Sequence, residues 1–464
     1  MRKKIAVILA VVLVVFGSAV PVSASSEAPV VSAEAALVMD MTTGDILYEK
    51  AADKSMFPAS TTKMLTAILA IENLNLSSIM TADDDVAVVT GSVLKMRSGE
   101  KISVKDALYC MMVGSCNDLA VLFAKTISGS VSAFAKLMNE KAEEIGCQNT
   151  HFRNPNGLND EEHLTTAYDL AVIARYCMQY ELFRDVVKTA EYTFTRGNGA
   201  LKAGTEETIK NTNWLLYDET HSMYVGNERR FPKYEGAIGI KTGHTTPARG
   251  CLVAAATRGE TTILTVVLHS DGDSKGSYER FVDSIKLLDW GFANYRTLTV
   301  MNMSTEVGTV KVKKGEFNKV KAVISSDIYA TLETGQQDSS ITTEVSMDSS
   351  LKAPFSRGTV CGKLDVFRDG QRIAQYDIVT ASAVKEGGFL SNFGIPDKTA
   401  KIIGTVLLIL VILVVAAFVA YIVYLKIKSN RIKARKAARA RARQEALERE
   451  RLEDEEYRRR NGLL

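Results

Sequence analysis

Two long runs of apolar residues interrupt the mixed hydrophobic and polar pattern of this chain. The first, residues 5–16, follows basic residues at positions 2–4 and precedes small residues that end in "VSA", which predicts an export signal over residues 1–24 with cleavage after Ala24. An uncleaved anchor helix is the alternative, although this run is short for a membrane span. The second run, residues 402–425, is uncharged and long enough to cross about 30 Å of hydrocarbon, so it predicts a transmembrane helix.

Between these runs the pattern changes from alternation to helical spacing and back. Residues 35–60 alternate around a "TTGD" turn and predict a strand pair. Residues 104–180 carry apolar side chains three and four positions apart and predict a block of helices. Residues 235–270 hold three β-type runs separated by glycine-containing turns, and a helix over residues 278–295 follows. Because strands come from both ends of the segment 30–296, we expect an α/β domain with one mainly antiparallel sheet and a helical cluster.

The pattern changes again near the carboxyl end. Residues 298–386 alternate Val, Thr and Ile with breaks rich in Gly, Asp and Ser, which predicts a separate all-β domain joined to the span by a linker, residues 387–401. After the span, residues 426–443 contain nine lysines and arginines and no acidic residue. The positive-inside rule therefore predicts that the tail, residues 426–464, is a solvated cytoplasmic helix and that residues 25–401 lie outside.

Composition changes this picture in few ways. Of the 464 residues, 46% are hydrophobic and 24% charged, so the chain can bury ordinary globular cores and is not disordered overall. The formal net charge of +3 hides the basic excess near the carboxyl end, and nothing in the pattern indicates a nucleic-acid partner. The cysteines lack C-x-x-C spacing, which argues against a zinc site and leaves disulfides or buried free thiols open. They are Cys110, Cys116, Cys147, Cys177, Cys251 and Cys361.

The stretch "FPASTTKMLTAILA" places a serine and a lysine at the start of an apolar helix predicted over residues 63–74. Residues three apart share a helix face, so the Ser60 hydroxyl and the Lys63 amine can meet. A buried amine near another cation loses its proton readily, and a neutral Lys63 can take the proton from Ser60. The alternative is that Ser60 or Thr61 caps an ordinary helix while Lys63 reaches solvent. The pair alone does not decide between the two.

Two later stretches supply further polar groups in the same chain. "GSCND" contains Ser115 and Asn117 between two predicted helices, and "IKTGHT" contains Lys241, Thr242 and Gly243 on a predicted strand. Nucleophilic catalysis on a peptide needs a second hydroxyl to relay a proton, an amide to hold the substrate backbone, and a cation with a hydroxyl for a terminal carboxylate. A glycine on the strand allows substrate to approach the backbone closely.

The order S-x-x-K, S-x-N, K-T-G is typical of penicillin-binding proteins and class A β-lactamases. Together with "FRNPNGL", "HLTTAYDLA" and "GIKTGHT", it makes residues 33–386 resemble the low-molecular-mass penicillin-binding proteins that are D-alanyl-D-alanine carboxypeptidases. The resemblance implies the serine β-lactamase and penicillin-binding-protein fold followed by a small all-β domain. It also implies removal of the terminal D-alanine from peptidoglycan stem peptides without a cofactor, and acylation by β-lactam antibiotics.

The same resemblance implies a role for each matching residue. Ser60 is the nucleophile and Lys63 its general base, while the backbone N–H groups of Ser60 and His244 form the oxyanion hole. Arg249 is a further candidate for holding the carboxylate. The full set comprises catalytic Ser60, Lys63 and Ser115, and substrate-binding Asn117, Lys241, Thr242, Gly243 and His244. The remaining histidines show no metal-ligand spacing, and we expect surface or packing roles for His151, His163, His221 and His269.

Two features depart from the family pattern. Three other functions are alternatives to the carboxypeptidase. Cys116 occupies the middle of S-x-N, where glycine is usual, and a full membrane span with a basic tail replaces the amphipathic anchor of many relatives. A β-lactamase would need a dedicated carboxylate base, and the context of Glu161 and Glu162 does not resemble one. A catalytically weak binding or sensing protein would use the same pocket. A transpeptidase would share the same motifs and differ only in the acceptor.

Overall fold

The computed structural model describes residues 27–200, 202–271 and 278–463, so the predicted export signal over residues 1–24 lies outside the described residues. The chain divides into two compact units. The first consists of residues up to Asn302 together with Ser326–Thr342 and Val366–Ile373, and the second of Met303–Ser325, Thr343–Asp365 and the chain from Ala374 onward.

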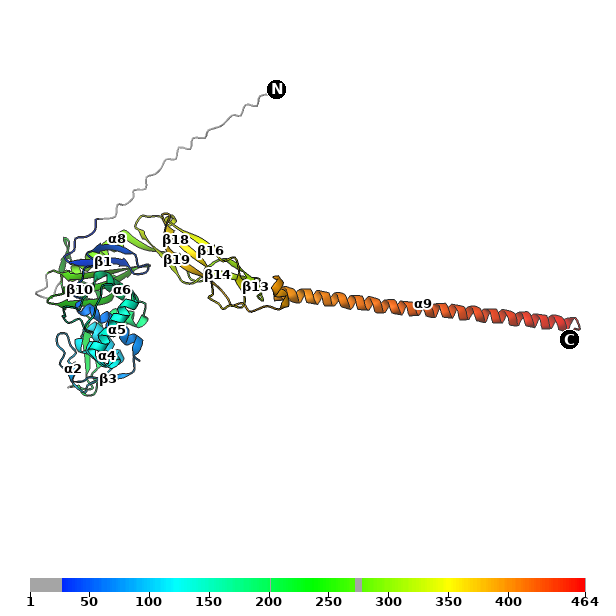
Figure 1. Ribbon diagram of the computed structural model, residues 1–464, viewed down its shortest axis with the longest axis horizontal. Helices are drawn as coiled ribbons and strands as arrows, with labels where there is room; N and C mark the ends of the chain where they lie inside the picture. Colours follow the sequence, from blue (N-terminus) through cyan, green and yellow to red (C-terminus); the bar gives the residue numbers. More distant parts are fainter. Residues whose placement is uncertain (1–26, 201, 272–277, 464) are drawn as a thin grey trace, which may run out of the picture. The chain divides into compact units, whose positions relative to one another are not determined.

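The first unit is built around one sheet of five strands (Figure 1). In spatial order the strands are β2 (Ile46–Lys50), β1 (Ala35–Asp40), β11 (Thr261–Ser270), β10 (Arg249–Arg258) and β9 (Ala237–Thr245). All neighbours are antiparallel, and Val266 of β11 lies opposite Leu37 on one side and Val253 on the other. Strands from both ends of the segment therefore share one sheet, as the sequence predicted.

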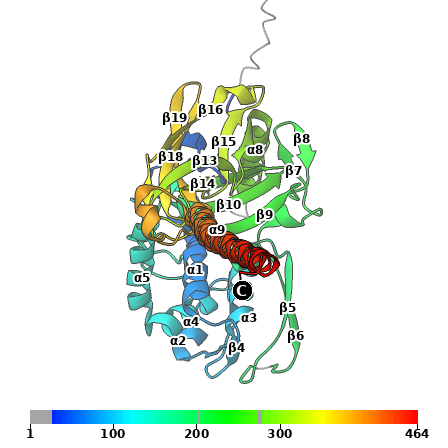
Figure 2. The ribbon, with the colours of Figure 1, turned by 90° about the vertical axis from the view of Figure 1, so that its right-hand side faces the viewer.

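Helices cover both faces of this sheet because its central strands are buried on both sides (Figure 2). One face packs against α8 (Glu279–Asn294), whose Phe281, Ile285 and Leu288 belong to that layer of the core. The other face packs against the predicted helical block, with α1 (Lys63–Asn73) buried along most of its length. The block also contains α3 (Val104–Val113), α4 (Asn117–Ser128), α5 (Val131–Glu144), α6 (Ala167–Cys177) and α7 (Glu181–Val187).

Shorter elements complete the first unit. They are the 3₁₀ turns η1 (Ala59–Thr62) and η2 (Trp214–Leu216), the helix α2 (Asp84–Ala87), and the hairpins β3 (Ile79–Thr81) with β4 (Lys101–Ser103), β5 (Glu191–Thr195) with β6 (Glu206–Lys210), and β7 (Met223–Val225) with β8 (Glu228–Arg230). The hairpins between residues 191 and 230 were not predicted. Their side chains are mostly exposed and polar, so they show little of the alternation on which a strand prediction depends.

The alternating pattern after residue 298 forms strands, as predicted. Two of them, β12 (Tyr295–Met301) and β15 (Ile328–Glu333), pair with each other. The others form a sheet in the order β16 (Ile341–Met347), β18 (Val360–Arg368), β19 (Gln371–Thr380), β14 (Lys319–Ile324), β13 (Glu306–Lys313) and β17 (Leu351–Lys352). Buried Val310, Val312, Leu364 and Val366 alternate with less buried residues on β13 and β18.

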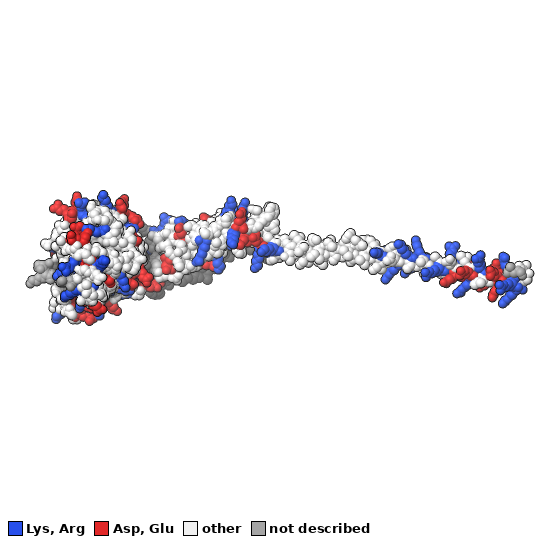
Figure 3. Space-filling model, turned by 90° about the horizontal axis from the view of Figure 1, so that it is seen from below, with Lys and Arg blue, Asp and Glu red and all other residues white. Residues whose placement is uncertain are grey.

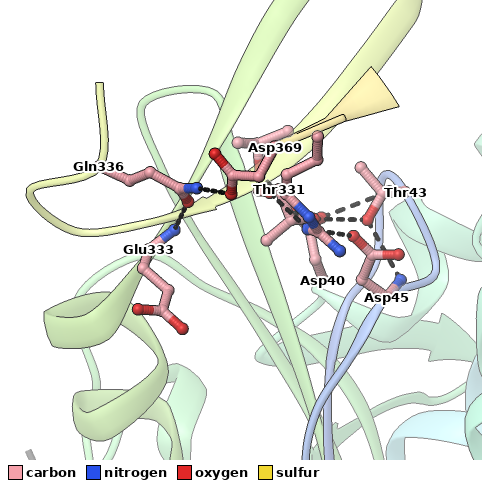
Figure 4. Close-up of polar contacts among 9 residues, drawn as sticks. Asp40, Thr43, Asp45, Thr331, Glu333, Gln336 and Asp369 are labelled. Carbon is pink, nitrogen blue, oxygen red and sulfur yellow. Dashed lines mark hydrogen bonds and ion pairs between the residues drawn. The ribbon is translucent and has the colours of Figure 1, made fainter. Parts of the chain in front are cut away.

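Within the first unit, Asp40 connects β12 and β15 to the large sheet (Figure 4). Its fully buried carboxylate accepts hydrogen bonds from Thr297 Oγ1 at 2.7 Å and Thr331 Oγ1 at 2.9 Å. The hydroxyl of Thr43 lies 2.7 Å from that of Thr331. These bonds offset the cost of burying the charge. A polar cavity of 460 Å³ adjoins them and is lined by Asp45, Ile46, Leu47, Tyr295, Thr331, Glu333, Gln336, Arg368 and Asp369, none of which is a predicted site residue.

The predicted span lies within one long helix, α9 (Asp397–Arg460), which continues without a break into the basic tail. It is preceded by the 3₁₀ turn η4 (Phe389–Phe393), so part of the predicted linker is helical. Its apolar residues are exposed, and it is long and apolar enough to cross a membrane. Such a surface is compatible with a membrane anchor. All six cysteines are free thiols, which removes the disulfide alternative for the residues that the structure describes.

Candidate active site

The serine and lysine of the first motif lie at the junction of η1 and α1. Ser60 belongs to the 3₁₀ turn rather than to the α-helix, which begins at Lys63. The N-cap of α1 is Thr62, and its side chain makes no capping bond. The Lys63 side chain is completely buried, and its Nζ lies 2.8 Å from Ser60 Oγ. The alternative in which Ser60 caps a helix and Lys63 reaches solvent is therefore wrong.

Lys63 Nζ has three polar neighbours, and as a protonated amine it donates to all three. Besides Ser60, it contacts Asn117 Oδ1 and the backbone oxygen of Asn156, each at 2.7 Å. Burial holds the pKa of Lys63 well below its ordinary value, and the nearby charge of Lys241 lowers this pKa further. A neutral amine donates two hydrogen bonds and accepts one. Once deprotonated, with two N–H bonds directed to the asparagine oxygens, the amine would turn its lone pair toward the Ser60 hydroxyl.

The second motif forms the turn between α3 and α4. Ser115 is buried and has a positive φ of 59°, a conformation that costs a non-glycine residue energy and is common at functional sites. Asn117 begins α4, and its Nδ2 donates to the carbonyl oxygen of Thr90 at 2.8 Å. That bond directs the amide oxygen of Asn117 toward Lys63. Gly91 is needed beside it, because a Cβ there would lie 2.8 Å from Asn117 Nδ2.

The third motif lies on β9, which packs against the turn that carries Ser60. A Cβ at Gly243 would lie 2.9 Å from the carbonyl oxygen of Pro58, so this glycine also permits close packing of the two segments. Lys241 is buried, and burial together with the neighbouring Arg280 lowers its pKa to about 7. The hydroxyl of Thr242 lies 2.6 Å from that of Thr212.

The two remaining predicted residues lie on either side of the turn between β9 and β10. His244 is exposed and pairs with Gly250 across these strands. Arg249 is half exposed and forms an ion pair with Asp271 at 2.5 Å. A different arginine, Arg280 of α8, donates to the carbonyl oxygen of Gly243 at 2.9 Å. Arg280 was not identified from the sequence, because only the packing of α8 against the sheet brings it to the third motif.

A loop for which the sequence suggested no role contacts the first motif. Its "NPNGL" stretch provides the Asn156 carbonyl that binds Lys63. Gly157 has a φ of +82°, and a Cβ there would lie 1.8 Å from the carbonyl oxygen of Ala59. The Asn154 side chain holds this turn, accepting from Gly157 N at 2.8 Å and donating to Leu158 O at 2.9 Å. The two asparagines and the glycine thus hold the loop against the Ser60 turn.

His163 links the same loop to η1. It is buried, and its Nδ1 accepts from the backbone N–H of Arg153 at 3.0 Å. A backbone amide only donates, so the ring proton is on Nε2, which lies 2.9 Å from Thr62 Oγ1. The Thr62 hydroxyl in turn donates to Ala59 O at 2.8 Å. Burial lowers the pKa of His163 to about 4, so the ring is neutral at physiological pH.

Cys116, the unusual residue of the second motif, is buried at the N-cap position of α4. Burial, with the nearby Asp118, raises the pKa of its thiol to about 12. The group is therefore a protonated thiol within the hydrophobic core of the first unit and does not act as a thiolate nucleophile. Among the residues that the structure describes, no group of three or more His, Cys, Asp or Glu side chains has a metal-binding arrangement.

Comparison with known proteins identifies the family of the chain. The family model described as D-alanyl-D-alanine carboxypeptidase matches residues 22–272. The chain belongs to this family. The model described as the C-terminal domain of penicillin-binding protein 5 matches residues 295–386.

Individual relatives match over most of the chain. D-alanyl-D-alanine carboxypeptidase DacF of Bacillus subtilis is 31% identical over 77% of this chain and 87% of its own length. The solved structure of penicillin binding protein 5 from Haemophilus influenzae is 29% identical, covers 77% of this chain and 99% of its own, and superposes with a TM-score of 0.61. A solved mutant of the Streptomyces K15 DD-transpeptidase is 34% identical over 57% of this chain and 99% of its own, with a TM-score of 0.51.

Proposed function

We propose that the protein is a membrane-anchored serine-type D-alanyl-D-alanine carboxypeptidase that removes the terminal D-alanine from peptidoglycan stem peptides and is acylated by β-lactams. The observation that carries the proposal is the 2.8 Å contact between Ser60 Oγ and Lys63 Nζ, in which the amine is buried and has a lowered pKa. A serine beside a neutral amine is the pair that acyl transfer requires. Family membership supplies the substrate class.

In the proposed reaction, Lys63 takes the proton of Ser60 as its oxygen attacks the carbonyl carbon of the penultimate D-alanine. The tetrahedral oxyanion is bound by the backbone N–H groups of Ser60 and His244. The peptide bond breaks, the terminal D-alanine leaves with a proton relayed by Ser115, and an acyl-enzyme remains. Water then attacks this ester and transfers a proton to Lys63, and Ser60 is restored as the acid product leaves.

The substrate carboxylate is assigned to the third motif. Lys241 and Thr242 would bind it, and Arg280 adds a positive charge through its position beside Gly243. Asn117 would hold the substrate backbone with its second amide hydrogen, since one is already given to Thr90. Each of these groups is held by bonds within the first unit, so little ordering is required when substrate binds.

We further propose that α9 crosses the cytoplasmic membrane once, with the catalytic unit outside and the tail inside. The uncharged residues 402–425 and the basic residues 426–443 support this orientation. In Figure 3 the apolar length of α9 is white and is followed by blue lysine and arginine side chains.

The deciding experiment measures D-alanine release from a peptide ending in D-Ala-D-Ala, with the detergent-solubilised full chain and its Ser60→Ala variant. Release by the unmodified chain alone supports the proposal and its nucleophile. A chain that is folded and acylated by penicillin but releases no D-alanine would instead be the binding or sensing protein.

Transpeptidation is a second candidate, because a DD-transpeptidase is among the similar solved structures. Hydrolysis and transpeptidation share the acyl-enzyme and differ in the attacking group. Adding glycine or a second D-amino acid to the same assay tests this. A new peptide product formed at the expense of free acid would indicate transfer, and unchanged hydrolysis would exclude these amines as acceptors.

A further inference from the structure

We propose that the end of the second unit next to α9 is a bilayer-binding surface, in which exposed phenylalanines insert among the lipid headgroups and surrounding lysines contact anionic phospholipids. This surface is formed by Phe317, Phe389 and Phe393 with the lysines near them in the chain. The proposal rests on the membrane anchor proposed above and adds a second, peripheral contact outside the span.

The aromatic part of the surface is unusually exposed. Phe389 is 77% exposed, Phe393 is 70% exposed, and Phe317 is 51% exposed. The rings of Phe389 and Phe393 pack edge to face, with centroids 5.7 Å apart, at the two ends of η4. Large apolar side chains grouped on a surface mark contact with another apolar phase. The core of the second unit does not cover them.

Hydrogen bonds connect this surface to the start of the span. Gly388 N donates to Asp397 Oδ1 at 2.8 Å, so η4 is bound to the first residue of α9. Asp397 N donates to Glu316 O at 3.1 Å, which connects α9 to the β13–β14 turn. Gly387 N donates to Lys314 O at 2.9 Å in the same turn. The three phenylalanines and the helix start therefore form one connected body.

The position of α9 determines how deep this surface lies relative to the lipid headgroups. Asp397 lies five residues before Ile402, where the apolar run begins, or about 7.5 Å along a helix at 1.5 Å per residue. Each headgroup layer of a bilayer is roughly 5–7 Å thick. If Ile402 begins the hydrocarbon segment, η4 lies at the outer edge of that layer. Tryptophan and tyrosine are enriched at headgroup level, and phenylalanine on membrane-surface segments inserts at the boundary between headgroups and acyl chains.

The charge of this surface also favours binding to a phospholipid bilayer. Residues 311–319 and 385–401 contain seven lysines and three acidic residues. The lysines are exposed, and in Figure 3 blue side chains lie together with red ones at the end of the second unit beside the white length of α9. Exposed phenylalanine flanked by lysine suits an anionic phospholipid surface, where each basic group adds electrostatic attraction. A protein partner is a weaker fit, because the adjoining span already holds this surface at a membrane.

The experiment places single tryptophans in the full chain reconstituted into lipid vesicles. Phe389→Trp and Phe393→Trp report on the surface, and Val345→Trp is the matched control, since Val345 is an exposed apolar residue of the second unit on β16, at the opposite edge of the sheet. Emission is read with and without brominated lipids, in neutral phosphatidylcholine vesicles and in vesicles that also contain phosphatidylglycerol. The unmodified chain provides the background of Trp214 and Trp290.

We expect blue-shifted emission and quenching by brominated lipid for Trp at positions 389 and 393, more strongly in the anionic vesicles, with neither effect at position 345. Vesicle flotation is measured on the same samples. Flotation without quenching at positions 389 and 393 would overturn the proposed bilayer-binding surface but not the proposed membrane span. Failure to float would overturn the membrane anchor and the surface together. Equal quenching in both lipid mixtures would overturn the contact between lysines and anionic headgroups.

Discussion

In the proposed mechanism two buried lysines of the first unit have opposite tasks, although their environments shift both pKa values in the same direction. Lys63 must be neutral to act as a base, whereas Lys241 must be charged to bind a carboxylate. Burial lowers the pKa of both, and a neighbouring cation lowers each further. The pKa of Lys241 is about 7, so its charge is present below that pH and is lost above it. Two asparagine oxygens accept hydrogen bonds from Lys63 Nζ. These bonds would orient the amine once it is neutral.

This difference predicts a pH dependence for acylation by a penicillin that carries a carboxylate. As the pH rises through about 7, Lys241 loses its proton, so the second-order rate constant of acylation should fall. Lys241→Arg keeps its charge at every accessible pH and should remove the fall on the alkaline side. Stopped-flow measurement with a fluorescent penicillin tests both chains. An equal alkaline fall in a folded Lys241→Arg variant would assign the ionisation to another group.

Residue spacing predicted only some of these contacts. The meeting of Ser60 with Lys63 follows from their separation by three residues in a helical segment. The bond from Lys63 to Asn156 could not be predicted, because its acceptor is a backbone carbonyl, which has no side-chain signature. The buried position of His163 was equally hidden, since a single histidine in a loop has no periodicity.

At the scale of elements, the nucleophile turn η1 is held by the loop of residues 152–163. Hydrogen bonds run from Arg153 through His163 to Thr62. Gly157 also packs closely against Ala59. Neither involves a residue that would touch substrate. Changing either interaction therefore tests whether the loop positions Ser60 and Lys63.

Replacing His163 with phenylalanine should lower stability and slow acylation. The change leaves the Arg153 amide without its acceptor, which costs about 1–3 kcal/mol. His163 binds protons less readily in the folded than in the unfolded chain, so stability should fall as the pH drops below about 6.5, by about 2 kcal/mol between pH 7 and pH 5. His163→Phe should lose that part of the pH dependence. Urea unfolding at both pH values measures it, with exposed His151→Phe as control.

Gly157→Ala should reduce stability and acylation more than Gly99→Ala. Both glycines have similar positive φ values, +82° and +81°, so both changes carry the same conformational cost of about 1 kcal/mol. Only Gly157 has a neighbour in the way, the Ala59 carbonyl, while a Cβ at Gly99 meets nothing within 4 Å. Thermal melts and penicillin acylation rates compare the two variants. Equal effects would show that the loop is not packed tightly against the nucleophile turn.

The sheet and the helical block were predictable because long buried elements leave a clear period in the sequence. The strands β10 and β11 are continuous apolar runs, and α1 and α4 are buried along one or more faces. The hairpins of residues 191–230 lack such a period, since few of their side chains are buried. The missed elements are therefore those that contribute least to the core.

At the scale of the whole molecule, the basic tail is the feature that supports the proposed orientation. Residues 426–443 carry nine positive charges, and each lysine or arginine placed at the centre of a membrane helix costs about 2.5–3.5 kcal/mol. We therefore expect translocation of this segment to be strongly disfavoured and the apolar run before it to stop in the bilayer. The uncharged run and the charged tail form one continuous helix, so no hinge separates them in the structure.

The proposed orientation predicts the result of protease treatment of intact cells from which the wall has been removed. With an epitope placed after residue 464, external protease should destroy penicillin binding and leave a small tagged fragment that contains α9 and the tail. Detergent should then expose the tail and remove the tag. The fragment is expected because the span shields residues 402–425 and the membrane separates residues 426–464 from the protease. Loss of the tag in intact cells with penicillin binding retained would show the reverse orientation, and would place the proposed active site on the side opposite its peptidoglycan substrate.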